Sequence, residues 1–251
     1  LPIYEIIGLN LYYKSKERIF DDYRQIWDYN SSTNLAQAFV HFKYSITEKL
    51  TLNAGLHAQL LFLNNSTSIE PRVGLIYNAT SNSSFNFGYG LHSQMQPINV
   101  YFLQSTDASG NTIYNNKNLG FTKSHHFVLG YNLQPANDWR IKAEMYYQSI
   151  YNVPVSISSS NYSMLNTGST FKTDLTDSLV NNGTGKNLGV ELTIEKFFNK
   201  GYYGLFTSSL YSSKYVASDG VERNTAFNGR YVFNILLLEV CFNLLIAFSL
   251  I

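Results

Sequence analysis

The chain has 251 residues, of which 14% are charged and 16% are aromatic, and its formal net charge is +1. This balance excludes a strongly basic surface of the kind that binds nucleic acid, and the single cysteine, Cys241, excludes a disulfide within the chain. Few charges combined with many aromatic residues are unusual in a soluble domain. They are typical of a membrane β-barrel, in which apolar and polar residues alternate.

Ten segments are predicted to be β-strands, because apolar and polar side chains alternate along them. In chain order they are Ile3–Tyr12, Leu35–Ile46, Leu50–Phe62, Ile69–Tyr77, Phe85–Met95, His125–Leu133, Trp139–Val153, Asn187–Phe197, Tyr202–Ser213 and Gly229–Ile235. Most reach the roughly 9–11 residues that a tilted membrane-spanning strand needs, whereas a soluble strand averages about 5–6. The sequence therefore predicts an all-β fold, an antiparallel meander of about ten long strands.

The connections between these segments alternate in length. The short ones are rich in turn residues and lie at Thr47–Lys49, Asn78–Ser84, Gln134–Asp138 and Phe198–Gly201. The long ones lie at Lys14–Asn34, Gln96–Lys123, Pro154–Lys186 and Lys214–Asn228, and only Leu63–Thr67 breaks the scheme by being short. Tight turns at one end and long loops at the other are typical of outer-membrane barrels, whereas a soluble sandwich is not expected to sort its loops in this way.

Aromatic residues gather beside the short turns, where a girdle at the boundary between lipid and water is expected. They are Tyr44, Tyr77, Phe85, Trp139, Phe197, Phe198, Tyr202 and Tyr203. Ordinary enrichment of aromatic residues in strands is the alternative explanation.

In six of these segments the alternation separates one apolar face from one polar face, with Phe39 and Ile76 as exceptions. In Leu50–Phe62, for example, Leu52 and Leu56 share one face and His57 and Gln59 the other. An Arg or Lys facing hydrocarbon at the bilayer midplane costs about 2–4 kcal/mol, and the apolar faces carry none. We expect these faces to meet lipid and the polar faces to line a lumen. The predicted lumen-facing wall residues are Lys43, His57, Gln59, Glu70, Arg72, Arg140, Lys142, Glu144, Glu191 and Glu195.

Four stretches carry a resemblance to a known family. They are LTLNAGLHAQLLFLNNSTSIEPRVGLIYN (Leu50–Asn78), KSHHFVLGYNLQPANDWRIKAEMYYQ (Lys123–Gln148), GKNLGVELTIEKFFNKGYYGLFTSSLYSSKY (Gly185–Tyr215) and RNTAFNGRYVFN (Arg223–Asn234). In arrangement, more than in any single motif, the chain resembles the barrel of TonB-dependent outer-membrane receptors. The resemblance implies a 22-stranded transmembrane barrel around an N-terminal plug domain, of which residues 1–234 are expected to be a part that lacks the plug.

The resemblance also implies a function and partners. Such receptors take up scarce, bulky nutrients, namely iron chelates, cobalamin, oligosaccharides or peptides. The implied partners are outer-membrane lipid, the missing N-terminal plug domain, the inner-membrane energising complex that acts through the missing part, and, in some systems, a surface lipoprotein; no nucleic acid is expected. A passive porin-like channel barrel and a soluble all-β adhesin or binding domain are the alternatives. Glu70 and Arg72, two residues apart on one face, are interpreted as an ion pair of the wall, with a contact to plug or substrate as the alternative.

The last 17 residues, 235–251, read ILLLEVCFNLLIAFSLI and depart from the family pattern. Three interpretations remain open for this apolar tail. It is long enough for a marginal transmembrane helix, it is apolar enough for a buried strand or helix, and the loss of alternation fits a truncated or out-of-frame reading of the gene. We favour the last of these, because the alternation stops where the resemblance stops.

No residue pattern points to catalysis, a cofactor or a metal. His125 and His126 are adjacent in a predicted strand, so at most one of them lines a site, and no other ligand stands at zinc spacing. The chain contains no G-x-S-x-G, H-E-x-x-H or phosphate-loop motif. We therefore expect a protein that is not an enzyme.

Overall fold

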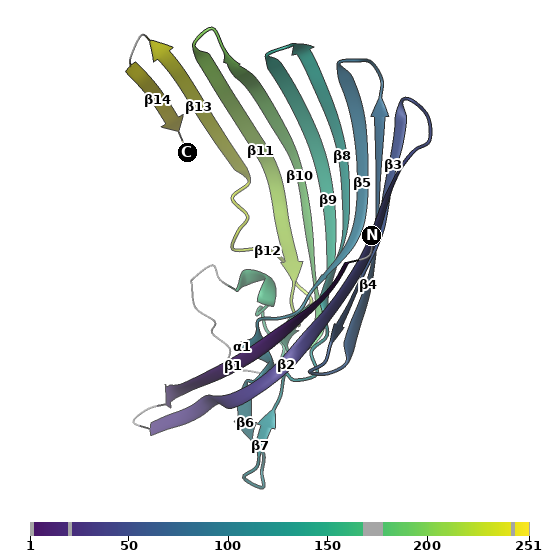
Figure 1. The fold of residues 1–251 in the computed structure, drawn as a ribbon. Coiled ribbons are helices and arrows are strands. Elements are labelled where there is room, and N and C mark those ends of the chain that lie inside the picture. The colour runs from purple at the N-terminus through teal and green to yellow at the C-terminus, as the bar shows by residue number, and fades with distance from the viewer. Residues whose placement is uncertain (1–2, 20–21, 168–177, 242–243, 251) are drawn as a thin grey trace.

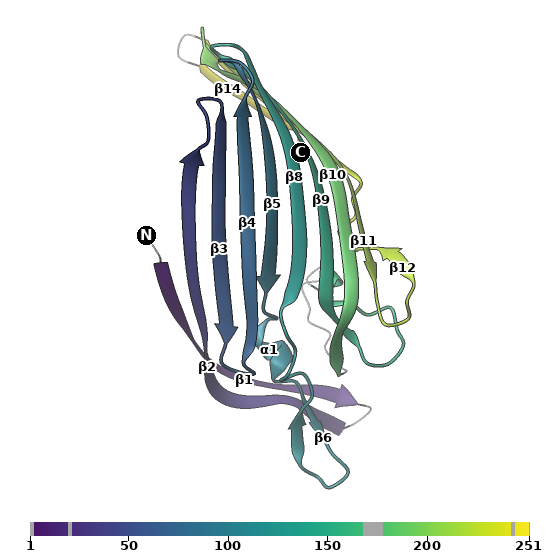
Figure 2. The ribbon, with the colours of Figure 1, turned by 90° about the vertical axis from the view of Figure 1, so that its right-hand side faces the viewer.

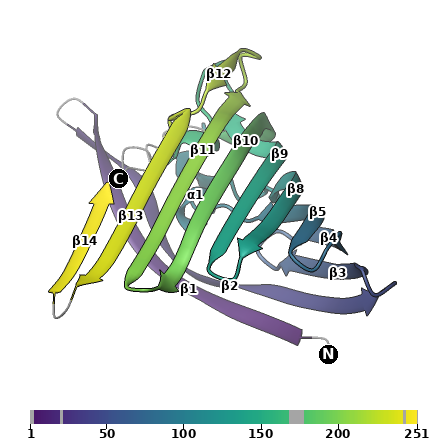
Figure 3. The same ribbon diagram turned by 90° about the horizontal axis from the view of Figure 1, so that it is seen from above.

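The computed structural model describes residues 3–19, 22–167, 178–241 and 244–250, and the side chains of 32–167 and 178–239. One large antiparallel sheet dominates it and curves around an open hollow (Figures 1 and 3). Its strands follow chain order: β1 (Ile3–Ile19), β2 (Asp22–Ser45), β3 (Leu50–Leu61), β4 (Ser66–Asn78), β5 (Ser83–Gln94), β8 (Thr122–Ala136), β9 (Trp139–Ser156), β10 (Leu179–Asn199), β11 (Tyr202–Val216), β13 (Tyr231–Cys241) and β14 (Leu244–Leu250). The predicted all-β meander of long strands is confirmed.

Smaller elements lie at one end of this sheet. Strand β12 (Glu222–Asn224) pairs with β11, and β6 (Gln104–Thr106) pairs with β7 (Thr112–Tyr114) in a separate hairpin. The one-turn helix α1 (Ile98–Tyr101) and the 3-10 turn η1 (Met164–Asn166) lie in the long connections. The predicted short turns gather at the opposite end, so the loops are sorted by length as expected (Figures 1 and 2).

The first long connection was predicted wrongly. Instead of a loop at Lys14–Asn34, β1 continues to Ile19 and β2 begins at Asp22, and the hairpin runs past the end of the neighbouring strands (Figure 2). Its register places Lys14 opposite Asp28 and Glu17 opposite Arg24. Opposite charges in directly paired positions favour strand pairing, so a segment that reads as polar loop extends the sheet.

The apolar tail forms strands rather than a helix. Residues 235–241 belong to β13, whose register with β11 runs from Tyr231 opposite Leu210 to Glu239 opposite Tyr202, and β14 pairs back onto β13. The helical interpretations of the tail are therefore wrong for its described part. No helix in the described parts of the chain is long and apolar enough to cross a membrane. That the barrel sequence ends at residue 234 and altered sequence follows it stays a prediction.

The convex face of the sheet is apolar and unusually exposed. Leu56, Ile69, Leu129, Met145 and Leu188 are each between 45% and 63% exposed. Most of the aromatic residues predicted to form the girdle beside the short turns are also exposed: Tyr44, Tyr77, Phe85, Trp139, Phe198 and Tyr202. An apolar surface of this extent requires an apolar environment, and a membrane barrel provides it on this side.

The hydrophobic core lies at the long-loop end, inside the curve of the sheet. Leu35 of β2 and Leu61 of β3 form one buried cluster with the connection between β5 and β8. The helix α1 of that connection lies inside the curve of the sheet (Figure 3). That connection contributes the buried residues Val100, Tyr101, Phe102, Leu103, Leu119 and Phe121. Burying each large apolar side chain stabilises the fold by about 1.5–3 kcal/mol, so this connection is held firmly against the mouth of the hollow.

Candidate functional site: the concave wall

The register of the sheet determines which residues line its concave face. Residues directly opposite one another in an antiparallel pair share a face, and the pairs Lys43 with Asn53, His57 with Glu70, and Gly55 with Arg72 extend from strand to strand across β2, β3 and β4. On β9 and β10, Arg140 pairs with Glu195, and Glu144 with Glu191. The register continues this face through β5 and β8, where Ile76 pairs with Asn86, Asn86 with Gly130, and Gly130 with Glu144. All ten predicted wall residues therefore lie on the face that carries Leu35 and Leu61. That this face lines the lumen of a closed barrel stays a prediction.

Hydrogen bonds join six residues of this wall into a polar cluster centred on Glu70, which we call the Glu70 cluster: Gln37, His57, Gln59, Glu70, Arg72 and Ser93. The Glu70 side chain is only 1% exposed. Its Oε1 accepts hydrogen bonds from the Gln59 amide, at 2.6 Å, and from the Ser93 hydroxyl. Its Oε2 lies 3.0 Å from both His57 Nδ1 and Arg72 Nη2.

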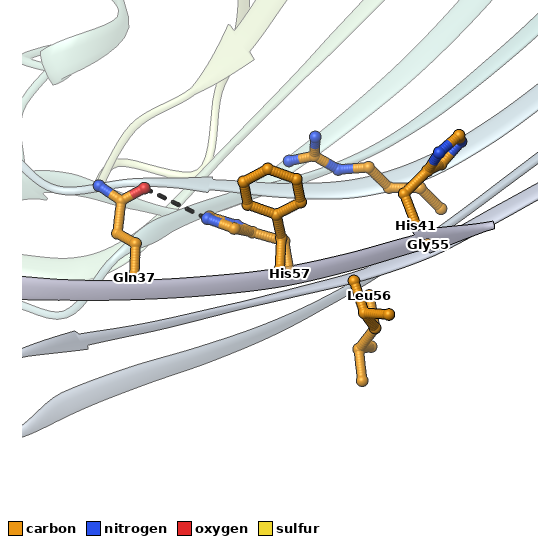
Figure 4. Close-up of a pocket in the computed structure, with 8 residues that line it drawn as sticks. Gln37, His41, Gly55, Leu56 and His57 are labelled. Carbon is orange, nitrogen blue, oxygen red and sulfur yellow. Dashed lines mark hydrogen bonds between the residues drawn. The ribbon is translucent and has the colours of Figure 1, made fainter. Parts of the chain in front are cut away.

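Four donors around one carboxylate satisfy its hydrogen-bonding capacity. An isolated buried carboxylate would be strongly destabilising, whereas charge-assisted hydrogen bonds are about twice as strong as neutral ones. His57 extends the cluster to β2, because its Nε2 lies 3.2 Å from the side-chain oxygen of Gln37 (Figure 4). The close-up also shows Leu56 on the other side of the strand from His57 and Gln37.

The Glu70 cluster lies where the backbone ladder opens. Strands β4 and β5 are paired only from Asn78 opposite Ser84 to Arg72 opposite Gly90, although β4 continues to Ser66 and β5 to Gln94. The pairing stops beside Pro71, which has no N–H to donate to a ladder. We call the unpaired stretch the β4–β5 seam.

Side chains close this seam in place of backbone bonds. The Gln59 amide donates to the backbone carbonyl of Ser93, at 3.3 Å, and to the Ser93 hydroxyl, at 3.0 Å, in addition to Glu70. Backbone polar groups that are shielded from water need partners, and Gln59 of β3 supplies one for the partly buried carbonyl of Ser93. The predicted ion pair between Glu70 and Arg72 is present and belongs to this arrangement.

An open depression of about 490 Å³ lies beside the Glu70 cluster. It is lined by Gln37, Phe39, Val40, His41, Gly55, Leu56, His57 and Arg72. Gly55 has no side chain to fill the depression. A Cβ at this position would lie only 3.1 Å from the carbonyl oxygen of Val40, which is a tight contact. Phe39 interrupts the polar alternation in the sequence, and the register places it on the concave face opposite His57.

A second group of polar residues lies on β9, β10 and β11. Arg140 Nη2 lies 2.9 Å from Glu195 Oε2, and the Tyr203 hydroxyl donates to the other oxygen of Glu195, at 3.3 Å. Tyr203 therefore contacts a residue of the concave face, whereas its position beside a short turn predicted that it would belong to the aromatic girdle. Lys142 Nζ lies 2.5 Å from Glu144 Oε2.

Glu191 differs from these residues. It stands directly opposite Glu144 in the register, and the two carboxylates flank an open depression of about 510 Å³. Like charges in directly opposite positions disfavour strand pairing. Apart from Val128, the remaining lining of the depression is polar or aromatic, and it includes His126, Tyr146, Gln148, Asn187 and Tyr211.

Long-range hydrogen bonds fix the connection over the mouth of the hollow. The side chain of Asn64, at the β3–β4 turn, donates to the carbonyl oxygens of Lys117 and Leu119. Asn116 accepts from the backbone N–H of Leu179, at 2.8 Å, and Asn181 accepts from that of Gly120, also at 2.8 Å. Sequence reasoning missed these asparagines, because Asn is common in any polar loop.

The two adjacent histidines do not form a metal site together. His126 lines the concave depression described above. His125 lies on the convex side, where its ring stacks on Tyr89 and Tyr151 at centroid distances of 6.1 and 5.4 Å. Among the described residues, no group of three or more His, Cys, Asp or Glu side chains is arranged to hold a metal ion.

A long-stranded curved sheet with a lipid-compatible convex face, a polar concave face and loops sorted by length defines the wall of an outer-membrane β-barrel. The model of the family described as TonB dependent receptor-like, beta-barrel matches residues 6–236. The chain belongs to this family and to the outer membrane of Gram-negative bacteria. No curated protein matches the chain.

Several solved structures share the fold. The FrpB iron transporter from Neisseria meningitidis (F3-3 variant) has a TM-score of 0.61 and 14% identity over 88% of this chain and 33% of its own. The siderophore receptor PiuA from Acinetobacter baumannii has a TM-score of 0.60 and 15% identity over 87% of this chain and 32% of its own. The alcaligin outer membrane receptor FauA from Bordetella pertussis has a TM-score of 0.58 and 15% identity over 99% of this chain and 45% of its own.

The chain thus spans about a third of the first two of these structures and less than half of the third. At such identities the likeness shows the shared fold alone. The total of 22 strands in a complete barrel stays a prediction.

Proposed function

We propose that this chain forms part of the barrel wall of an outer-membrane active-transport receptor that takes up a scarce, bulky nutrient. The observation that carries the proposal is the family match over residues 6–236. The concave wall supports it, because a face that is polar along several strands suits an aqueous lumen or a polar plug.

Within this proposal, an N-terminal plug domain outside the present chain fills the hollow and transmits force from the inner-membrane energising complex. The two polar regions of the wall then have different roles. The Glu70 cluster satisfies its own hydrogen bonds and holds the wall together. In the depression around Glu191, an exposed carboxylate is available to contact the plug domain or a ligand in the hollow.

Iron chelates are the first ligands to test. The similar solved structures are described as an iron transporter, a siderophore receptor and an alcaligin receptor. Cobalamin, oligosaccharides and peptides follow, since the family serves all of these substrate classes.

Uptake by the receptor expressed from its complete gene tests the proposal. Radiolabelled ferric chelates, cobalamin, an oligosaccharide mixture and a peptide mixture are offered to cells with and without a working energising complex. We expect saturable uptake of one class that is lost without the complex. Uptake that is independent of the complex and proportional to concentration would instead indicate a passive channel.

A further inference from the structure

His57, in the depression beside the Glu70 cluster, has a hydrogen-bond partner at each ring nitrogen. Its Nδ1 lies 3.0 Å from Glu70 Oε2, on β4. Its Nε2 lies 3.2 Å from Gln37 Oε1, on β2 (Figure 4). The His57 side chain is only 15% exposed, so these two neighbours determine which of its nitrogens carries a proton.

Glu70 fixes one proton at Nδ1 of His57. An ionised carboxylate accepts hydrogen bonds and donates none, so the ring nitrogen that faces it has to donate. Three further donors, from Gln59, Ser93 and Arg72, surround the same carboxylate and satisfy its ionised form. The imidazole ring therefore gains or loses its second proton at Nε2, the nitrogen that faces Gln37.

The side-chain amide of Gln37 has to follow the charge of His57. A glutamine amide accepts at its oxygen and donates at its nitrogen, and half a turn about the last side-chain bond exchanges the two. When His57 is charged, Nε2 donates and the amide oxygen faces it, which is the orientation in the structure. When His57 is neutral, Nε2 accepts, and only the amide NH₂ group can meet it without leaving two acceptors face to face.

The other end of this amide belongs to the surface of the depression. Gln37 and Arg72 both line the depression, and the amide nitrogen of Gln37 points away from His57 (Figure 4). Arg72 is 48% exposed, and its guanidinium has five donors, of which Nη2 supplies one to Glu70. With charged His57 the two side chains present donors, which complement a carboxylate. With neutral His57 a carbonyl oxygen stands beside the guanidinium, and the pair complements a group that both donates and accepts, such as an amide.

Other charged and titratable groups face His57 from the neighbouring strands. Strand β4 contributes Glu70 and Arg72, and β2 contributes His41, which lines the same depression. Strand β5 contributes His92, whose charge interacts with those of His57, Glu70 and Arg72. Carboxylates and guanidinium groups ordinarily keep their charges between about pH 5 and pH 8, whereas histidines change theirs. Within this set, a titration therefore has to separate His57 from the two other histidines.

We propose that His57 is a proton-operated switch of this depression. Loss of the proton from Nε2 to water in the hollow turns the Gln37 amide by half a turn and replaces a donor by an acceptor at the surface of the depression. The wall thereby changes the kind of group that it accepts when the acidity of the medium changes. The switch depends neither on which nutrient the receptor carries nor on the plug domain.

Nuclear magnetic resonance of the complete receptor in detergent tests the switch. The side chains of histidine and glutamine are labelled with ¹⁵N, and spectra are recorded between about pH 5 and pH 8. The signals of His57 and Gln37 are identified by their absence from His57→Asn and Gln37→Met. We expect protons on both nitrogens of His57 at the acidic end and on Nδ1 alone at the basic end. The Gln37 amide signals should shift with the same midpoint.

Three outcomes in the parent protein would overturn the proposal. They are a His57 ring whose charge does not change over this range, a neutral ring that keeps its proton on Nε2, and a Gln37 amide signal that does not follow the ring. Folding of each variant is checked by its heat-dependent migration on a gel.

A matched pair of substitutions tests the contact between the ring and the amide. Gln37→Glu places an acceptor that cannot donate opposite Nε2, and should raise the midpoint of the His57 titration by about 1–3 pH units. Gln134→Glu is the control, because the Gln134 amide lies beside a short turn and donates to the backbone carbonyl of Asn137. An unchanged midpoint in Gln37→Glu, or an equal rise in Gln134→Glu, would contradict the switch.

A further variant separates His57 from the two other histidines. In His57→Asn the Gln37 amide signal should lose its pH-dependent shift, although His41 and His92 still titrate. A shift of the parent's size in this variant would assign the pH dependence to one of those histidines and would overturn the role of His57.

Discussion

Two carboxylates on the same wall, Glu70 and Glu191, have opposite surroundings. Glu70 is buried and accepts hydrogen bonds from both neighbouring strands, beside a stretch where the backbone ladder has opened. Glu191 is exposed, faces Glu144, and lies where the ladder between β9 and β10 is continuous. Where the backbone ladder between two strands is open, a polar side chain is used to hold the strands together. Where the ladder is complete, the side chain remains available for contacts with other molecules.

Removal of the buried carboxylate should have the largest effect. Glu70→Ala leaves the donors of Gln59, Ser93, His57 and Arg72 without their acceptor, and we expect a loss of about 2–4 kcal/mol in the free energy of unfolding. Urea unfolding of the complete receptor in detergent, followed by tryptophan fluorescence, measures it. Glu191→Ala is the matched control, and an equal loss there would erase the contrast between the two carboxylates.

Removal of the amide that bridges the seam should have an intermediate effect. Gln59→Leu keeps the size of the side chain but leaves the carbonyl of Ser93 and one oxygen of Glu70 with fewer donors. We expect a loss of about 1–2 kcal/mol and faster amide hydrogen exchange at the outer ends of β4 and β5. Unchanged exchange there would show that Gln59 does not hold the seam.

Neutralising the exposed carboxylate should change stability slightly and in the opposite direction. Glu191→Gln removes the repulsion from Glu144 across the strand pair, and we expect a gain of about 0.2–1 kcal/mol. The same urea titration measures this gain. A clear loss would instead mean that Glu191 already has a cationic partner in the complete receptor.

The smallest effect should come from a partly exposed ion pair in the long connection between β11 and β13. Arg223 binds both oxygens of Asp219, at 2.9 and 2.7 Å, and holds the pKa of that carboxyl below its ordinary value, helped by the backbone N–H of Val221. A lowered folded-state pKa stabilises above the ordinary aspartate pKa of about 3.9, and this contribution is lost as the pH falls through the lowered value.

Amide exchange at Asp219–Asn224, measured from pH 6 downward and corrected for its intrinsic pH dependence, tests this pair. We expect protection to hold above about pH 4 and to fall below it in the parent protein. In Asp219→Asn, protection should start lower and show no such step. A step of equal size in the variant would assign the pH dependence to another group.

Much of the fold follows from residues with a strict period. Leu50–Phe62 alternates almost without fault, and its strand, its faces and its short turn follow from that pattern. The segment Lys14–Asn34 does not alternate, and its pairing depends on which charge meets which across the hairpin, information that a single strand does not contain.

The candidate site was only partly predictable for a similar reason. Parity predicts that Gln59 and Glu70 share a face, and Pro71 signals a weak ladder. Neither shows that Ser93, far along the chain, completes the cluster. That contact depends on how far β5 diverges from β4, which is a property of the curved sheet. Tyr203 is likewise predicted to be a girdle residue, and the hydrogen bond from its hydroxyl to Glu195 is visible only in the structure.

The β4–β5 seam also bears on the mechanics of the wall. Ladder bonds fix the distance between two strands at every second residue, whereas side chains such as those of Gln59 and Glu70 can change rotamer and still keep an acceptor within reach. The wall can therefore bend at the seam without losing a backbone bond. The β4–β5 seam is therefore a point at which the wall can flex, and it lies at the end of the sheet against which the large connection containing α1 packs.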